Sequence, residues 1–201
     1  IIMSNNIENK IYEILSKEDE YVEISGDKNP FKIDFKDNTY LLHFSKIHSY
    51  YKKPNMRRIQ IDADLKTQFL KYYEFNYICG IFGYDENTDT ISTWSTSYLD
   101  TEFKSGKSLY TTINSIEDAT DKGISKYHIK ENYQNYSIHF QSKYLPYYFT
   151  QYSDCQKIIE NKIIEFKGFE KHHIENDFHI LEDKITKLHF PLYPDLEKKI
   201  S

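Results

Sequence analysis

The two arginines of the chain stand side by side, and their surroundings predict a surface that binds phosphate or a base edge. Arg57 and Arg58 are the only arginines among 26 basic residues. They lie in the stretch His48–Ile61, HSYYKKPNMRRIQI, which also holds Lys52 and Lys53 and contains no acid. Arginine is a planar, permanently charged fork that binds guanine edges or phosphates through two hydrogen bonds, whereas lysine is a point charge. We therefore predict an arm that contacts DNA.

A second polar stretch, Ser95–Ser108, carries hydroxyls and lysines that suit phosphate contacts. Its sequence, STSYLDTEFKSGKS, contains the end of a phosphate-binding loop motif, S-G-K-S. The full motif needs a glycine five residues before Gly106, and Thr101 stands there. The stretch also leads into the strand-like run LYTTI instead of a helix whose N-terminus could hold phosphate. We expect it to contact DNA phosphates and to bind no nucleotide.

Part of the same stretch allows a different interpretation, a metal-dependent nuclease. Glu102 and Lys104 match the E-x-K half of the PD-(D/E)xK core, with Asp85 or Asp89 as an upstream metal ligand. That chemistry needs carboxylates converging on magnesium from a rigid apolar strand. The residues before Glu102 are too polar for such a strand, and a glycine follows soon after at Gly106. Cleavage by Asp89, Glu102 and Lys104 remains the alternative function.

The histidines near the C-terminus do not have the spacing of a metal site. His172 and His173 are adjacent, so they cannot share one face of a helix, and His179 completes no H-x-x-x-H pair. We expect these histidines to cap a helical segment or to lie on its surface. Cys79 and Cys155 are too few and too far apart for a disulfide framework or a zinc site.

Composition limits where positive charge can act. The 201 residues carry a formal net charge of −5, so the chain is not a uniformly basic nucleic-acid binder, and any DNA-binding charge must be local. With 19 tyrosines and 13 phenylalanines the core must be rich in aromatic rings, which argues against disorder. Trp94 is expected in that core. No signal peptide and no bilayer-length apolar run is seen, so a soluble cytoplasmic monomer is expected.

Short strands and short helices are expected to position the two polar stretches. Alternating and apolar runs predict strands at residues 21–25, 31–35, 39–44, 58–62, 76–84, 90–94, 109–113, 126–129 and 136–140. Helical spacing and capping residues predict helices at residues 4–17, 64–73, 115–122 and 145–152. The fold class is therefore mainly β with flanking short helices (α+β), a barrel-like core over residues 1–153. Residues 154–201, charged and helical in period, form a helical appendage or connector.

Four stretches, taken in order, resemble the DNA-recognition domains of prokaryotic restriction systems. They are NPFKIDF, the arm ending in RRIQI, GYDENTDTISTW followed by KSGKSLYTT, and EDATDKGISKYHIKENYQNYSIHFQSKYLPYY. The resemblance covers residues 28–152. It implies the B3-like open β pseudobarrel of EcoRII-type enzymes and plant B3 transcription factors. The chain looks most like the N-terminal domain of a LlaJI-type, McrB-like restriction subunit. Such a domain precedes a GTP-hydrolysing AAA+ motor and works with a separate nuclease subunit.

The resemblance also implies two arms that grip the major groove of double-stranded DNA, here residues 49–58 and 95–108. The residues then expected to contact DNA are Tyr50, Lys52, Lys53, Asn55, Arg57, Arg58, Gln60, Ser97, Tyr98, Thr101, Lys104, Ser105, Lys107 and Ser108. Neighbours in a strand point opposite ways, so only one of the two arginines is expected to reach the bases. The chain itself is expected to be non-catalytic and to need no cofactor. A third interpretation is a protein-interaction module whose helical tail docks a partner.

Overall fold

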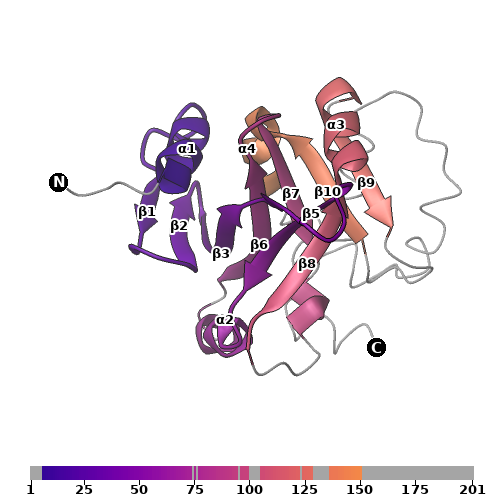
Figure 1. The fold of residues 1–201 in the computed structure, drawn as a ribbon. Helices are drawn as coiled ribbons and strands as arrows, with labels where there is room; N and C mark the ends of the chain where they lie inside the picture. The colour runs from indigo at the N-terminus through magenta and orange to yellow at the C-terminus, as the bar shows by residue number, and fades with distance from the viewer. Residues whose placement is uncertain are drawn as a thin grey trace, which may run out of the picture.

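The computed structural model describes residues 6–73, 75, 77–94, 96–99, 105–122, 124–128 and 136–150. Within this part the chain forms two β-sheets with short helices around them (Figure 1). Several sequence predictions fall outside it: the helical appendage of residues 154–201 with its histidines, and also Thr101, Glu102, Lys104 and Cys155.

The larger sheet has seven strands in the order β1-β2-β3-β6-β7-β10-β9. They are β1 (Glu23–Ser25), β2 (Phe31–Phe35), β3 (Asn38–Lys46), β6 (Ile78–Asp85), β7 (Thr90–Trp94), β10 (Tyr136–Gln141) and β9 (Ile124–His128). Neighbours pair antiparallel except β3 and β6, which run parallel. A parallel pair needs a long crossover, and here the crossover carries part of the second sheet.

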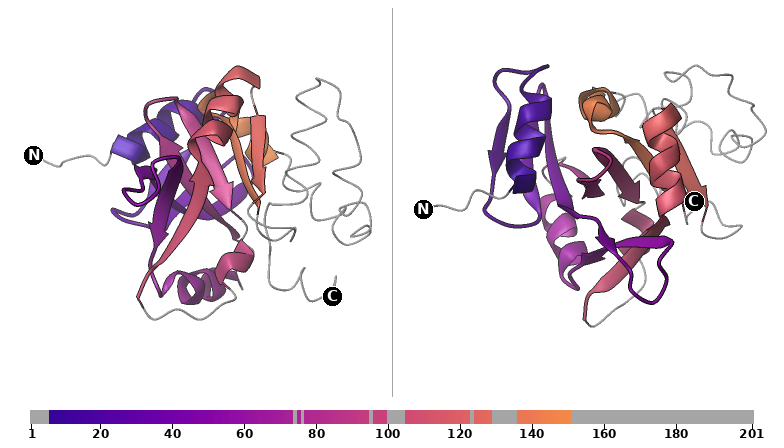
Figure 2. Two further views of the ribbon diagram at one scale, coloured as in Figure 1. Left: turned by 45° about the vertical axis from the view of Figure 1, so that its right-hand side comes forward. Right: turned by 45° about the horizontal axis from the view of Figure 1, so that its top comes forward.

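The smaller sheet has three antiparallel strands in the order β4-β5-β8. They are β4 (His48–Ser49), β5 (Met56–Ile61) and β8 (Lys107–Thr112). The helices are α1 (Asn6–Leu15), α2 (Leu65–Tyr73), α3 (Ile113–Lys122) and α4 (Leu145–Thr150), with short 3-10 turns at η1 (Thr96–Leu99) and η3 (Ser142–Tyr144). Figures 1 and 2 show α1 with β1 at one end of the larger sheet and α3 with β9 at the other.

Apolar side chains cover both faces of the larger sheet. On β3, Leu42 and Phe44 face a core shared with α1 and α4, whereas Leu41 faces a second core shared with β5, β8 and α2. This alternation is what a period of two residues requires of a strand buried on both sides. At Gly83 on β6, a Cβ would lie 2.8 Å from Ile59 Cγ2, so glycine permits β5 to approach the larger sheet this closely.

The predicted fold class is confirmed: the described structure is mainly β with short helices, and its sheets do not close into a barrel. Most predicted elements are found within two residues of their expected bounds. The first hairpin turns at Lys36 and Asp37, where Lys36 takes the left-handed conformation (φ 50°), so the second strand begins at Asn38, one residue before its expected start at residue 39. Trp94 is buried, as predicted, and Cys79 is buried as well. No helix in the described residues is long and apolar enough to cross a membrane.

The two polar stretches contain more regular structure than predicted. The first is a hairpin in which β4 pairs with β5, so that Arg57 and Arg58 lie within a central strand and not at a sheet edge. The second begins with η1 and ends in β8. Both stretches therefore contribute to the same three-stranded sheet, which brings them together.

Candidate nucleic-acid interface

The outward face of the three-stranded sheet collects polar side chains from both stretches. On β5, Ile59 and Ile61 are buried in the second core, whereas Gln60 is exposed and Arg58 partly buried. Because alternate residues of a strand share a face, Arg58 and Gln60 both point away from the core. On β8 the buried residue Leu109 fixes the same alternation.

Strand β8 places matching polar groups beside those of β5. Its register sets Tyr110 opposite Arg58 and Ser108 opposite Gln60. On the other side of β5, His48 pairs with Arg58 and is exposed. The outward residues of the three strands are His48, Met56, Arg58, Gln60, Ser108, Tyr110 and Thr112, which we call the sheet face. It contains no acidic residue.

The guanidinium of Arg58 is oriented by aromatic and hydroxyl neighbours. Its Cζ lies 5.1 Å from the ring centroid of Tyr50, a cation–π distance, and Nη1 donates a long hydrogen bond of 3.4 Å to Ser108 Oγ. The ring of Tyr50 in turn lies 5.4 Å from that of Tyr110. In the described structure neither arginine takes part in an ion pair. The fork of Arg58 is therefore held in place, and no carboxylate among the described residues neutralises it.

Arg57, the residue directly before Arg58, has a different environment. Its Nη1 donates to the backbone oxygens of Pro54 (2.9 Å) and Met56 (3.0 Å), which lie in its own hairpin. The hairpin tip is also tied to the body of the protein, because the amide of Ile113 donates to the Asn55 oxygen at 2.9 Å. Arg57 thus stabilises the hairpin that presents Arg58. The prediction that the two arginines point opposite ways is confirmed.

The remaining predicted residues of the first stretch lie at the hairpin tip. Lys52 and Lys53 are exposed, and the Lys52 ammonium lies 5.6 Å from the ring centroid of Tyr51. The tip is closed by backbone hydrogen bonds from Lys53 to Tyr50 (3.0 Å) and from Met56 to Lys53 (2.9 Å). These two lysines are free to reach a phosphate backbone beyond the sheet face.

In the second stretch, Lys107 is turned inward. Its Nζ donates to the backbone oxygen of Tyr98 at 2.9 Å and lies 5.5 Å from that ring, so it connects η1 to β8. Burial lowers the pKa of Lys107 and raises the pKa of the Tyr98 phenol. Ser105 is exposed. Thr101, Lys104 and the side chain of Ser97 lie outside the described structure, so their predicted contacts stay predictions.

The back of β8 is fixed to the larger sheet by buried polar contacts. Trp94 Nε1 donates to the Tyr110 backbone oxygen at 3.0 Å. The buried ring of His139 lies 2.9 Å from Thr111 Oγ1 and 2.6 Å from Ser92 Oγ, so it bridges β8 to β7 and β10. Buried polar groups held in this way specify one arrangement of the elements around them. The sheet face is consequently a rigid platform.

Four members of the sheet face were missed by sequence reasoning: His48, Met56, Tyr110 and Thr112. Tyr110 could have been found, because the run LYTTI alternates and its leucine had to face the core. His48 could not, since its position depends on a two-residue strand that pairs only in the folded hairpin.

A comparison with known families places this geometry in context. A family model described as Methylase-associated X1 matches residues 38–149, more than half of the chain. The chain belongs to this family. Association with a methylase links the family to restriction-modification systems, and the match spans every strand of the three-stranded sheet. No curated protein and no solved structure matches the chain.

The methylase-associated domain shows no metal centre in its described residues, where no three histidine, cysteine or acidic side chains gather around one point. The carboxylate of Asp89 accepts hydrogen bonds from Tyr84 and Ser142, each at 2.8 Å, and pairs with Lys10 at 3.2 Å. Burial alone would raise the pKa of Asp89, but these partners hold it below its usual value. Since Glu102 and Lys104 lie outside the described residues, the nuclease interpretation is not tested.

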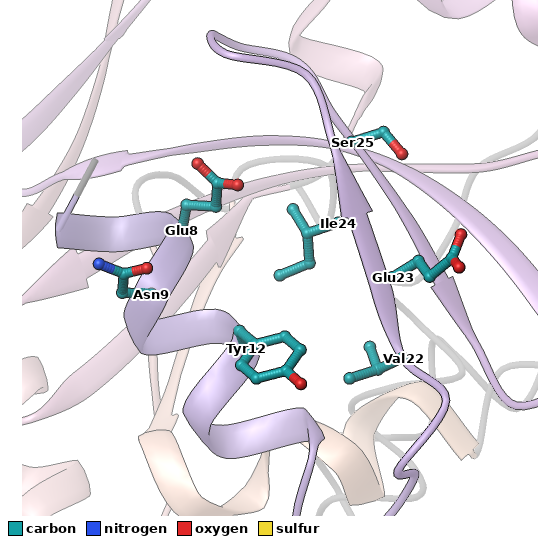
Figure 3. A pocket seen from close by; sticks show the side chains of 7 residues that line it. All are labelled: Glu8, Asn9, Tyr12, Val22, Glu23, Ile24 and Ser25. Carbon is teal, nitrogen blue, oxygen red and sulfur yellow. The ribbon is translucent and has the colours of Figure 1, made fainter. Parts of the chain in front are cut away.

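A shallow groove of about 390 Å³ lies between α1 and β1 of the methylase-associated protein (Figure 3). It is lined by Glu8, Asn9, Tyr12, Val22, Glu23, Ile24 and Ser25. Two carboxylates and no lysine or arginine face it, so it would repel a phosphate. The groove also lies outside the residues that the family model matches. The sheet face is therefore the stronger candidate for binding nucleic acid.

Proposed function

We propose that this chain recognises a specific double-stranded DNA sequence as the targeting domain of a restriction system, through the sheet face, and does not itself cut DNA. The observation that carries the proposal is the environment of Arg58. The only fork on this face is oriented by Tyr50 and Ser108, and none of the strand residues around it is acidic. A binder of negative net charge needs such a local site, because its overall field repels DNA.

The shape and chemistry of the sheet face suit the major groove. That groove admits a two-stranded β-ribbon, and its base edges are read by arginine on guanine and by glutamine on adenine. Arg58 and Gln60 supply these two groups from one strand. Lys52 and Lys53 at the exposed hairpin tip, with Ser105, would contact phosphates and fix the register on the duplex.

The wider assembly is proposed from the resemblance of four sequence stretches to LlaJI-type subunits, together with membership of a methylase-associated family. In this proposal the fold is B3-like, and the full protein couples DNA recognition to a GTP-hydrolysing AAA+ motor. A separate nuclease subunit would cut the DNA. The described domain needs neither a metal nor a nucleotide for recognition.

Selection of bound duplexes from a randomised pool, without metal or nucleotide, tests the proposal. We expect one short sequence to be enriched by the parent chain and bound far more tightly than unrelated DNA at physiological salt. Arg58→Ala should remove most of this preference, whereas Lys71→Ala on α2, outside the sheet face, should keep it. Equal affinity of the parent for every duplex would contradict the proposal.

A further inference from the structure

The spacing of the two base-reading groups on β5 restricts the DNA sequence that this face can read. Arg58 and Gln60 are separated by one residue, Ile59, whose side chain is buried on the other face. Alternate residues of a strand lie about 6.7 Å apart. Both residues pair with β8, and Arg58 also pairs with β4, so the sheet holds this strand extended and keeps the separation.

The chemistry of the two side chains assigns a base to each. An arginine fork pairs with the O6 and N7 acceptors of guanine, and the glutamine amide pairs with N6 and N7 of adenine. The Gln60 side chain is exposed and faces Ser108 across the ladder, while Arg58 faces Tyr110. Neither group has a carboxylate partner within the described structure that would compete with a base.

We propose that the preferred site contains a guanine and an adenine no more than two base-pair steps apart, read by Arg58 and Gln60 respectively. This inference rests on the proposed function. Bases along one strand rise by about 3.4 Å, so a strand that follows the groove carries its alternate side chains about two steps apart. A strand that crosses the groove obliquely brings the same side chains to adjacent steps. In both cases the arginine and the glutamine read separate base pairs.

The test compares the sequence preferences of three variants with that of the parent in the same randomised pool. Arg58→Lys keeps the charge and loses the fork, so the guanine preference should fall by about 5- to 150-fold at one position. Gln60→Glu should lose the adenine preference at a second position and shift it toward cytosine, because a carboxylate accepts from cytosine N4. Gln68→Glu on α2 makes the same chemical change outside the sheet face and should leave every preference unchanged.

The outcomes separate this inference from the proposed function. A parent chain without any sequence preference refutes the proposed function. The spacing inference alone is refuted if the parent is selective but the two variants do not behave as expected. This would be the case if Arg58→Lys and Gln60→Glu altered the base preference at no position, at the same position, or at positions more than two steps apart. Thermal unfolding of each variant checks that the sheet is intact. We expect it to be, because Gln60 is exposed and the lysine in Arg58→Lys keeps the positive charge.

Discussion

Arg57 and Arg58 are neighbours of the same chemical type, yet their guanidinium groups have different surroundings. Arg57 donates to two carbonyl oxygens of its own hairpin, whereas Arg58 lies over Tyr50 on the sheet face. An arginine whose fork is already engaged with the backbone would lose those bonds on binding a base. An arginine that rests on an aromatic ring keeps its donors available while its rotamers are restricted, so that less entropy is lost on binding.

Tyr50 is accordingly predicted to position Arg58. Tyr50→Leu removes the ring and should reduce discrimination at the position that Arg58 reads by about 2- to 5-fold, the usual strength of an exposed cation–π contact. Tyr50→Phe keeps the ring and should behave like the parent. Competition binding with the preferred duplex and its single-substituted version measures both. Equal discrimination by the leucine variant would show that Ser108 alone orients the fork.

Arg57 is predicted to matter for stability more than for base preference. Arg57→Lys keeps the charge but loses the planar guanidinium whose Nη1 donates to both the Pro54 and the Met56 oxygen, and it should cost roughly 1 kcal/mol because these bonds are partly exposed. Urea unfolding measures the loss, and duplex selection checks that the preferred sequence is unchanged. A shift of preference at any base pair would place Arg57 among the reading groups.

At the scale of elements, the hairpin β4–β5 presents Arg58 and Gln60 on β5 and the two lysines of its tip. Lys52 is exposed at this tip, while Lys107 on β8 is turned toward the Tyr98 oxygen. The two lysines looked equivalent in the sequence. Their surroundings differ because β8 begins at Lys107, two residues before the predicted start of the strand, and this places Lys107 on the same side as the buried Leu109.

The salt dependence of binding should distinguish these lysines. Lys52→Ala is predicted to weaken binding to all duplexes alike and to lower the slope of log K against log salt by about one, the value for one released counterion. Lys107→Ala should leave the slope nearly unchanged and instead reduce stability through loss of its contact with Tyr98. Titrations at several salt concentrations measure the slopes. Equal slopes for Lys52→Ala and the parent would mean that this lysine touches no phosphate.

Much of this element structure could be predicted from the sequence. Alternation in runs such as FKIDF and LYTTI identifies strands and their buried faces, since burial of one face is a local pattern. Pairing could not be predicted in the same way. Nothing in the residues around His48 shows that they return against Arg58, or that β3 runs parallel to β6, because such contacts depend on the path of the whole chain. The sheet face therefore needed the structure.

The buried side chain of His43 on β3 is expected to make the stability of the fold depend on pH. Burial lowers the pKa of His43 to about 4 from 6.5, although Asp62 and the Gln60 backbone act in the opposite direction. Between these values the unfolded chain binds a proton that the folded chain does not. Stability should therefore fall as the pH falls from 6.5 to 4, by on the order of 3 kcal/mol in all.

Urea unfolding across this pH range measures the effect. His43→Gln cannot titrate and should lose this part of the pH dependence, leaving the contribution of the other groups. If the variant and the parent had parallel pH profiles, the folded chain would have to accommodate a protonated His43.

At the scale of the molecule, charge is distributed unevenly. The net charge is −5, yet the sheet face has no acid and the groove between α1 and β1 has two. Under the proposed function, an acidic chain whose sheet face carries no acid would orient on DNA through that face, and its acidic parts would disfavour non-specific contacts. This distribution favours selectivity over general affinity.

Cleavage by the chain alone is predicted to be absent. Asp89, the described member of the alternative nuclease set, is already engaged by Lys10, Tyr84 and Ser142. A supercoiled plasmid incubated with the chain and magnesium should therefore stay intact while a duplex is still bound. Nicking that required magnesium and disappeared in a Glu102→Gln variant would establish the nuclease function instead.

The crossover between the parallel strands β3 and β6 has an evolutionary consequence. Residues 47–77 leave the larger sheet at Lys46 and return to it at Ile78, and they carry β4, β5 and α2. The hairpin β4–β5 is thus an excursion from the larger sheet, and its two strands pair within the smaller sheet. If the proposed function holds, descendants of one ancestor could exchange the outward residues of this excursion, provided that Ile59 and Ile61 stayed apolar, and so acquire new target sequences on the same scaffold.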